Sequence, residues 1–166
     1  LTPRQRREAS ERLCHRLKAL PEVQGARRVA LYLPNDGEID PTPLIGWFER
    51  RHARVHLPVL KPLSRNWLWF VHYHTGTPMV HNRFGIPEPE TLDLILLPLV
   101  GFDDDGNRMG MGGGFYDRTL AFTRHAGPRP KLIGLAHECQ RVERLPVAPW
   151  DVPLDAIASD ARTVRQ

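Results

Sequence analysis

Polar and apolar residues alternate over the first twenty positions at the spacing of an amphipathic helix. Apolar side chains recur at positions 9, 13, 17 and 20, with mostly charged residues between them. Thr2 is a capping residue, followed by a proline and, at the third helical position, by a glutamine that completes a capping box. We therefore predict a helix from Pro3 to about Leu20, ended by Pro21 and Gly25.

Short, nearly continuous apolar runs bounded by glycine or proline predict β-strands. The run Leu92–Val100 gives the clearest prediction, because its leucine and isoleucine content suits a central parallel strand buried on both faces. The aromatic and β-branched residues of Trp67–Tyr73 predict an antiparallel strand. Shorter runs predict further strands at Arg28–Leu33, Val55–Leu57, Lys131–Ala136 and Ala156–Ala158.

Helical signals lie between these strands. Asp40, followed by a proline, repeats the capping pattern and predicts a helix to about Arg51, and Phe115–Arg124 predicts another. Thr75–Glu90 contains repeated glycine and proline and is expected to be a loop. Strands alternating with helices predict an α/β fold, a three-layer sandwich with a mostly parallel central sheet, over a single domain of residues 1–166.

Composition narrows the function classes without choosing one. The chain has 166 residues, 41% of them hydrophobic and 25% charged, as expected of one globular domain. No apolar run approaches the ~18 residues that a transmembrane helix needs, and the first twelve residues lack the apolar core of a secretory signal. We expect a cytoplasmic protein. The net charge of +4 is interpreted as ordinary solubility rather than as a sign of nucleic-acid binding.

The stretch Arg108–Asp117 is the best candidate for a functional segment. Four glycines occupy the five positions 110 to 114, and such use of glycine indicates that something approaches the main chain closely. The N–H groups of a glycine loop between a buried strand and a helix can converge on phosphate oxygens, and Arg108 would add a fixed positive charge. An ordinary flexible turn is the alternative. The stretch matches neither the Walker A nor the G-x-G-x-x-G pattern.

Carboxylates flank this stretch. Asp117 follows the glycines at a position suited to Mg²⁺, which needs only one or two carboxylates when phosphate and water complete its coordination. Asp103–Asp105 are interpreted as a solvated turn, and Asp151 suits either a metal ligand or a structural turn. Glu38 follows the first predicted strand, at the sheet edge where α/β proteins bind ligands, although a surface turn would also explain it.

Histidines and cysteines give weaker signals. His72 and His74 share one face of a predicted strand, but no third ligand has a suitable spacing, so structural histidines are favoured over a zinc site. Cys14 and Cys139 lie far apart in the sequence and are expected to be reduced thiols.

Taken together, the motifs resemble the signature of the 5-formyltetrahydrofolate cyclo-ligase family, also called methenyltetrahydrofolate synthetases. The resemblance spans nearly the whole chain and is more specific than any single glycine loop. It rests on the runs Leu97–Asp103 and Gly106–Arg118, on Tyr32-Leu33 with Glu38-Ile39-Asp40, on Gly134-Leu135-Ala136 with Gln140, and on Leu145-Pro146 with Trp150–Asp155.

The resemblance implies an ATP- and Mg²⁺-dependent cyclisation of 5-formyltetrahydrofolate to 5,10-methenyltetrahydrofolate, with release of ADP and phosphate. Phosphorylation turns the formyl oxygen into a good leaving group, after which the folate N10 attacks the activated carbon. Such chemistry requires the protein to align two reactants and to neutralise charge on the transferred phosphoryl group. The implied fold is the one shared by sugar-phosphate isomerases and CoA transferases.

Site residues carry over from the family by position. Arg108, Met111, Gly112 and Gly113 would lie at the reaction centre, and Asp117 and Asp151 would hold Mg²⁺. The residues that would bind ATP are Arg108, Met109, Gly110, Met111, Gly112, Gly113, Gly114, Phe115 and Tyr116. Those that would contact the folate are Leu33, Glu38, Met111, Gly112, Gly113, Gly114 and Phe115, with the Glu38 carboxylate paired to N–H donors of the pterin ring.

Two departures from the family pattern bear on ATP binding. Family members carry a Lys/Arg-rich ATP-binding segment before the first helix, and we expect it to be missing ahead of Leu1. The nearby Arg4, Arg6 and Arg7 lie inside the predicted helix, so that role is not transferred to them. Some members also have a lysine where this chain has Gly113.

The alternative function is a catalytically silent nucleotide- or folate-binding protein of the same fold. A basic nucleic-acid-binding module is a third hypothesis, but the chain has no RRM, KH or helix-turn-helix signature. We expect folate and ATP as small-molecule substrates, no nucleic-acid or membrane partner, and a monomer in preference to an oligomer.

Overall fold

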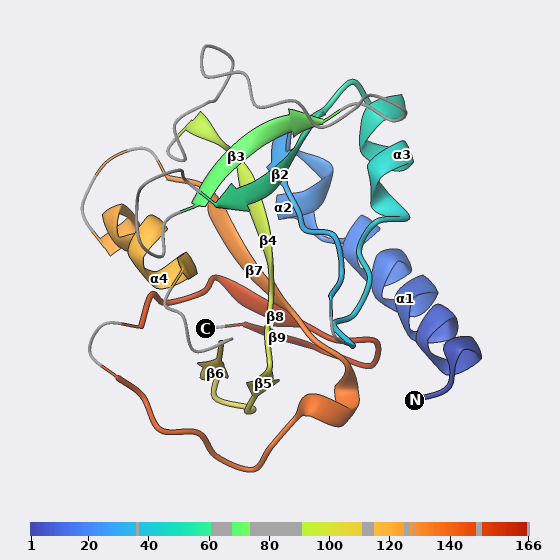
Figure 1. Ribbon diagram of the computed structural model, residues 1–166, viewed down its shortest axis with the longest axis vertical. Helices are drawn as coiled ribbons and strands as arrows, with labels where there is room; N and C mark the ends of the chain where they lie inside the picture. The colour runs from blue at the N-terminus through green and yellow to red at the C-terminus, as the bar shows by residue number, and fades with distance from the viewer. Residues whose placement is uncertain are drawn as a thin grey trace.

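A seven-stranded sheet forms the centre of the computed structural model, which describes residues 1–35, 37–60, 68–73, 91–110, 115–124, 127, 129–148 and 151–165 (Figure 1). Its strand order is β3-β2-β1-β4-β7-β8-β9. The five strands from β2 to β8 are parallel, and β3 and β9 pair antiparallel at the two edges. The strands are β1 (Arg28–Ala30), β2 (Arg54–Leu60), β3 (Leu68–Tyr73), β4 (Leu94–Pro98), β7 (Lys131–Leu135), β8 (Ala156–Ala158) and β9 (Thr163–Arg165). The predicted α/β fold with a mostly parallel sheet is confirmed.

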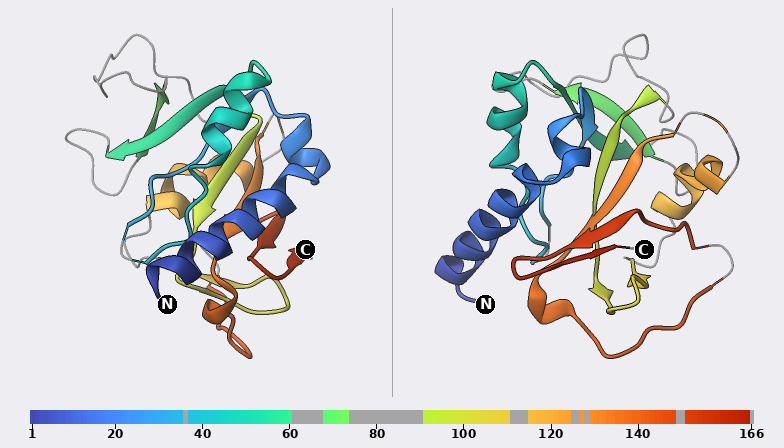
Figure 2. Two further views of the ribbon diagram at one scale, coloured as in Figure 1. Left: turned by 90° about the vertical axis from the view of Figure 1, so that its right-hand side faces the viewer. Right: turned by 180° about the vertical axis from the view of Figure 1, so that it is seen from behind.

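Helices cover both faces of this sheet. Those on one face are α1 (Pro3–Lys18), α2 (Pro21–Gln24) and α3 (Leu44–Arg50), and α4 (Phe115–Thr119) lies on the other. Figure 2 shows the same layers from the side and from behind. Two 3₁₀ helices, η2 (Ala121–Arg124) and η3 (Glu138–Gln140), follow α4 and β7. No helix in the described ranges is long and apolar enough to cross a membrane.

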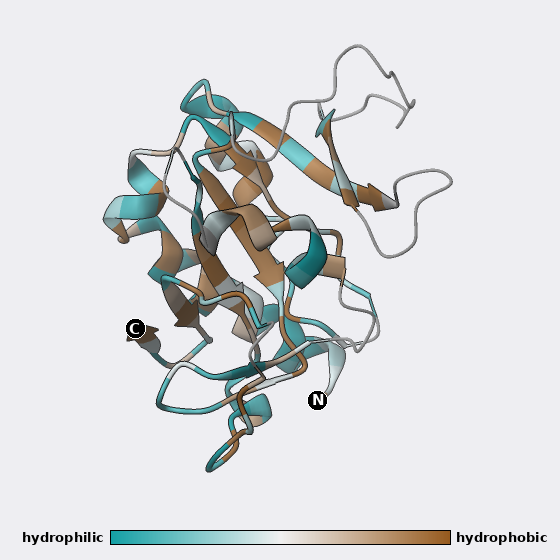
Figure 3. Cartoon of the chain, turned by 90° about the vertical axis from the view of Figure 1, so that its left-hand side faces the viewer, coloured by the Kyte–Doolittle hydropathy of each residue, from teal (hydrophilic) through white to brown (hydrophobic). Residues whose placement is uncertain are grey.

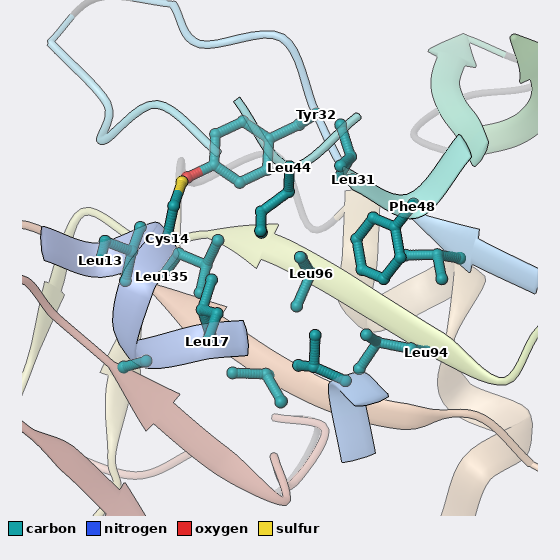
Figure 4. Packing of buried hydrophobic residues seen from close by; sticks show 14 of the residues in the cluster. Leu13, Cys14, Leu17, Leu31, Tyr32, Leu44, Phe48, Leu94, Leu96 and Leu135 are labelled. Carbon is teal, nitrogen blue, oxygen red and sulfur yellow. The ribbon is translucent and has the colours of Figure 1, made fainter. Parts of the chain in front are cut away.

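Alternation along β4 fills two cores at once. Leu94 and Leu96 pack with α1, α2 and α3, whereas Ile95 and Leu97 pack on the opposite face with Leu120, beside α4. All four β4 side chains are at most 1% exposed, because successive residues of a strand point to opposite faces. Figure 4 shows the first core, and Figure 3 shows hydrophobic strands inside hydrophilic helix surfaces. The prediction of a central strand buried on both faces is confirmed.

The N-terminal helix forms for the reasons that its sequence suggests. Thr2 accepts a hydrogen bond from the Gln5 N–H at 3.1 Å, and the Gln5 side chain accepts one from the Thr2 N–H at 2.8 Å. Leu13 and Leu17 are fully buried against the sheet. The helix α1 ends at Lys18, shortly before the predicted stop, and Pro21 begins the four-residue α2, which was not predicted.

Asp40 does not cap a helix as expected. Its carboxylate accepts hydrogen bonds from the N–H and hydroxyl of Thr42 at 2.8 and 2.6 Å, which forms a local turn. The helix α3 begins only at Leu44, after Pro43 at its N-cap. Aspartate favours such turns as strongly as helix caps, and here the turn is formed.

Several boundaries also differ from the predictions. Strand β1 ends at Ala30, and β2 extends to Leu60. The predicted helix Phe115–Arg124 is divided into α4 and η2. Three short strands have no visible sequence pattern, because two or three residues carry no periodicity: β9 at the sheet edge, and β5 (Gly101–Phe102) with β6 (Arg108–Met109), which form a separate two-stranded hairpin. The predicted loop Thr75–Glu90 lies outside the described residues.

Candidate functional site

The strand order creates a switch point beside β1. The chain passes from β1 to β2 on one side, and β4 then pairs with the other side of β1. In parallel α/β sheets, ligands bind outside the carboxyl ends of the strands at such a point. The segments that leave this edge are the loop after β1, the β5–β6 hairpin after β4, and η3 after β7, which lie together near the bottom of Figure 1.

Arg108 and Asp117 lie on the two sides of the glycine-rich stretch and form an ion pair with each other. Their side chains are only 7% and 19% exposed. The Arg108 guanidinium also donates to the Val152 carbonyl at 3.2 Å, and the Asp117 carboxylate accepts the Val152 N–H at 2.9 Å. The pair therefore joins both ends of the glycine-rich stretch to the segment that contains Asp151. Arg108 Nε is buried and has no hydrogen-bond partner in the described part of the chain.

The buried carboxylate of Asp103 holds together the turn of the β5–β6 hairpin, which carries Arg108. This carboxylate is fully buried and accepts hydrogen bonds from the N–H groups of Asp105, Asn107 and Leu145 and from the Asn107 side chain. Burial by itself would raise the pKa of Asp103, but these hydrogen bonds outweigh it and lower the pKa. The prediction of a solvated turn is wrong for Asp103 and correct for the exposed Asp104 and Asp105.

Glu38 lies in the loop that follows β1, as the sequence predicted. Its carboxylate accepts the Asn35 N–H at 2.8 Å, and its own N–H donates to the Asn35 carbonyl at 3.0 Å. The Tyr32 hydroxyl donates to the Ile39 carbonyl at 2.6 Å and so closes the base of the loop. Leu33, three residues after the end of β1, is 56% exposed.

Two tyrosines, Tyr32 in the loop after β1 and Tyr116 in α4, have pKa values that change in the same direction. Burial raises the pKa of Tyr116, and the charge of Glu38 raises it further. Burial likewise raises the pKa of Tyr32, with the charge of Glu38 as the next cause and Tyr116 also contributing.

The structure brings some of the predicted site residues together and places others only by their loops. Arg108, Phe115, Tyr116 and Asp117 flank the glycines, Asp151 adjoins Val152 beside Asp117, and Glu38 lies in a loop that leaves the same edge of the sheet. Met109 is exposed and Gly110 is partly exposed, so this part of the stretch is accessible. Met111, Gly112, Gly113 and Gly114 lie outside the described residues, as does Trp150. Since α4 has only five residues, its own dipole offers little to an anion.

The carboxylates are compatible with Mg²⁺ bound together with a nucleotide. Asp117 uses one oxygen for Arg108 and Val152, and Asp151 accepts the Ala148 N–H at 2.9 Å. A carboxylate has about four lone-pair sites, so Asp117 could still give one oxygen to a metal. Within the described ranges no group of three or more histidine, cysteine, aspartate or glutamate side chains could hold a metal ion.

Two further residues lie near this edge. Gln140, part of the family motif but given no role from sequence, donates to the carbonyls of Leu99 and Val100 at 2.9 and 3.0 Å and joins the ends of β4 and β7. His137, just after β7, is 3% exposed and lines a pocket with Glu38. The His56 and His72 rings lie 5.4 Å apart across β2 and β3, and no metal-binding group of three such side chains is found around them in the part of the chain that the structure describes. His74 lies outside the described residues. Cys14 and Cys139 are free cysteines, as expected.

The fold is that of an α/β protein, and its candidate site lies at a topological switch point, where proteins of this class bind their ligands. The family model of the 5-formyltetrahydrofolate cyclo-ligase family matches residues 1–160. The 5-formyltetrahydrofolate cyclo-ligase of Escherichia coli (strain K12) is 44% identical over 172 residues, which cover 98% of this chain and 93% of that protein. The enzyme of the same name from Haemophilus influenzae is 43% identical over 164 residues, with 93% and 87% coverage.

Solved structures agree with these relatives. The NMR structure of the 5,10-methenyltetrahydrofolate synthetase of Aquifex aeolicus has a TM-score of 0.79 and 33% identity, with 99% of this chain and 84% of that chain covered. The 5,10-methenyltetrahydrofolate synthetase of Mycoplasma pneumoniae has a TM-score of 0.76 and 28% identity, with 96% and 90% covered. The chain belongs to the 5-formyltetrahydrofolate cyclo-ligase family, and the resemblance inferred from its motifs is confirmed.

Proposed function

We propose that the protein uses ATP to close 5-formyltetrahydrofolate to 5,10-methenyltetrahydrofolate, with release of ADP and phosphate. Family membership over nearly the whole chain supports this reaction. The single structural observation that carries it is the Arg108–Asp117 ion pair, because it joins both ends of the glycine-rich stretch to Val152, next to the second predicted metal ligand, Asp151. The loop that carries Glu38 leaves the same edge of the sheet, so a site for phosphate and a site for a donor-rich heterocycle can adjoin there, as transfer between two substrates requires.

The residues have separate tasks in this proposal. The main chain from Arg108 to Tyr116 cradles the ATP phosphates, and Arg108 supplies positive charge beside them. Leu33 contacts the folate ring system, and Glu38 accepts hydrogen bonds from pterin N–H groups. Met111–Phe115 face both substrates across the reaction centre, where the formyl oxygen takes the γ-phosphoryl group and N10 then displaces phosphate. Closing the site around both substrates keeps water from the phosphorylated formyl group.

Mg²⁺ is part of the proposal, with Asp117 and Asp151 as its protein ligands. When bound, it would neutralise negative charge on the nucleotide phosphates. The Arg108–Asp117 ion pair keeps one ligand in place, and the Val152 N–H orients the same carboxylate. A single-domain monomer in the cytoplasm completes the proposed assignment.

The decisive experiment mixes protein, 5-formyltetrahydrofolate, ATP and Mg²⁺ and follows the methenyl product by its absorbance. We expect product to form only with all components present and ADP to appear in equal amount. A Gly112→Val variant should lose ATP affinity and keep the fold, because a side chain there would block close approach to the main chain. Folded full-length protein that binds 5-formyltetrahydrofolate but yields no product under any nucleotide condition would support the silent binding protein instead.

A further inference from the structure

A pocket of about 520 Å³ opens beside the Glu38 loop. Its walls come from three segments: the first turns of α1, the loop from Pro34 to Pro43 after β1, and His137 after β7. This volume lies within the range of about 300–1,000 Å³ that is usual for small-molecule sites. Since Glu38 lines the pocket, a ligand that pairs with Glu38 has room to extend from there toward α1.

His137 is an unusual residue to find in this wall. Its side chain is 3% exposed, and within the described residues neither ring nitrogen makes a well-formed hydrogen bond, with the Gly37 backbone as a weak partner at most. A buried polar group without a good partner carries a free-energy penalty of about 1–3 kcal/mol, which a hydrogen bond from a ligand would relieve. Burial lowers the pKa of His137, with Asp160 and the Gly37 backbone opposing this effect and Arg6 adding to it. A neutral imidazole has one donor and one acceptor, so at least one ring nitrogen is left for a ligand.

The charged groups of the pocket are divided between its sides. Arg6 and Arg7 lie near the start of α1. The first turn of this helix has no acidic residue, so nothing there offsets the positive end of the helix dipole. Glu38 and Asp40 come from the loop after β1, and Asp40 already accepts two hydrogen bonds from Thr42. Glu11 of α1 also lines the pocket, so its positive side depends on the two arginines together.

These groups together match the chemistry of a folate. A folate has pterin N–H donors at one end, a benzoyl amide with one donor and one acceptor in the middle, and glutamate carboxylates at the other end. We propose that the pocket binds the glutamate end of the folate, with His137 hydrogen-bonded to the amide and Arg6 and Arg7 paired with the carboxylates. The inference rests on the proposed function, because it takes the pterin to be at Glu38.

The test replaces both arginines, as R6A/R7A, and compares two substrates. One is 5-formyltetrahydrofolate, and the other is its dimethyl ester, in which both glutamate carboxylates are capped. For the unchanged protein we expect the KM of the ester to exceed that of the acid by about tenfold, the scale of one lost charge-assisted hydrogen bond. In R6A/R7A the KM of the acid should rise to that of the ester, while kcat and the KM for ATP stay within about twofold.

A charge-matched control is available on the same helix. The R4A/R12A variant also removes two positive charges from α1, but neither residue lines this pocket. Arg4 makes only an exposed ion pair with Glu8, and Arg12 pairs with Asp160. The control should keep the tenfold preference for the acid. His137→Phe should raise the KM of the acid and of the ester alike. His137→Gln should restore part of the lost folate affinity, because glutamine again offers a donor and an acceptor.

The outcomes separate this inference from the proposed reaction. If R6A/R7A forms product and keeps the same preference for the acid, the glutamate end is bound elsewhere and the inference is overturned. If only the KM for ATP rises, the arginines bind nucleotide phosphate, which also overturns it. Equilibrium binding of 5-formyltetrahydrofolate without ATP gives a readout independent of turnover. Absence of both binding and product in the unchanged protein would instead defeat the proposed function.

Discussion

Arg108 and Asp117, nine positions apart on the two sides of the glycine-rich stretch, form an ion pair and both hydrogen-bond to the backbone of Val152. The pair has two consequences. It ties the ends of the stretch to the segment that follows Asp151, and it sets a positive and a negative group side by side where phosphate and metal are proposed to bind. Asp117 thus has a structural role as the partner of Arg108 and a proposed role as a metal ligand, and an experiment must measure the two separately.

Replacement of Asp117 by Asn should weaken both roles to different extents. The amide can still accept the Val152 N–H, but the largely buried Arg108 loses its counter-charge, so we expect a loss of about 2 kcal/mol in unfolding free energy. If Asp117 also binds Mg²⁺, the Mg²⁺ concentration for half-maximal rate should rise about tenfold or more. Titration of activity against Mg²⁺, together with urea unfolding, measures the two effects separately.

Asp105→Asn is the matched control. This exposed carboxylate lies in the β5–β6 hairpin that carries Arg108, and it makes no ion pair within the described residues. It should change neither quantity. An Asp117→Asn protein that is destabilised but keeps the original Mg²⁺ dependence would mean that Asp117 only supports Arg108.

Glu38→Gln addresses the other half of the site. Glutamine keeps the oxygen that accepts the Asn35 N–H, so the loop after β1 should keep its shape. It loses the charge that would pair with pterin N–H groups, and the KM for 5-formyltetrahydrofolate should rise about tenfold or more with an unchanged KM for ATP. Steady-state kinetics with each substrate varied in turn give both values. A rise in the KM for ATP alone would contradict the assignment of the pterin to Glu38.

Asp103→Asn tests how the hairpin positions Arg108. Four donors converge on this fully buried carboxylate, and an asparagine must turn its own amide group toward some of them. We expect a loss of about 2–3 kcal/mol in unfolding free energy, measured by denaturation. The KM for ATP should rise as well, since Arg108 lies in the second strand of the hairpin. Activity at full ATP affinity in the folded variant would show that the hairpin does not position Arg108.

Long, strongly patterned elements could be predicted from sequence because their signals are local. The capping box of Thr2 and Gln5 and the buried run of β4 are read correctly from neighbouring residues. The prediction that Asp103 lies in a solvated turn is wrong because its environment is not local. One of its hydrogen-bond donors, Leu145, lies 42 positions away, so its burial is decided by tertiary contacts that a turn pattern does not contain.

The site residues likewise divide into those marked by a local motif and those placed only by the tertiary fold. Motif resemblance points to Glu38, Arg108 and Asp117 because each lies in a recognisable run. No local sequence pattern singles out His137. It becomes a candidate only because it follows β7 and lines the same pocket as residues of α1 and of the Glu38 loop. Signals of this kind become visible only when strand order is known, since the order β2-β1-β4-β7 decides which loops share an edge.

Gly134 should tolerate no side chain. A Cβ there would lie 2.7 Å from Leu99 Cδ1 and 2.9 Å from Leu154 Cδ1, and both leucines are buried. Gly134→Ala should therefore cost about 1–3 kcal/mol in unfolding free energy, by overpacking. In Gly46→Ala of α3, the nearest contact is the mobile end of Arg50, and alanine should stabilise the helix by up to about 1 kcal/mol. Equal stability of the two variants in urea would contradict this account of the β7 packing.

His56 should make the protein less stable in acid. The residue is 4% exposed in β2, and burial lowers its pKa from 6.5 to about 4, with the neighbouring His72 contributing and the Val29 carbonyl opposing. Between about pH 6.5 and pH 4 the unfolded chain binds a proton at this position and the folded chain does not. The unfolding free energy must then fall as the pH falls through this window, by about 2–3 kcal/mol from this group.

Urea unfolding at pH 7 and at pH 4.5 measures that fall, and His56→Gln isolates the part due to this ring. Other groups, such as His137 and the paired carboxylates, change protonation in both proteins, so the quantity to compare is the difference between the two pH values. It should be smaller in His56→Gln by about 2 kcal/mol, whereas His15→Gln on the exposed surface of α1 should leave it unchanged. An equal fall in all three proteins would mean that the buried imidazole is already protonated when the chain is folded, contrary to its burial beside Val29.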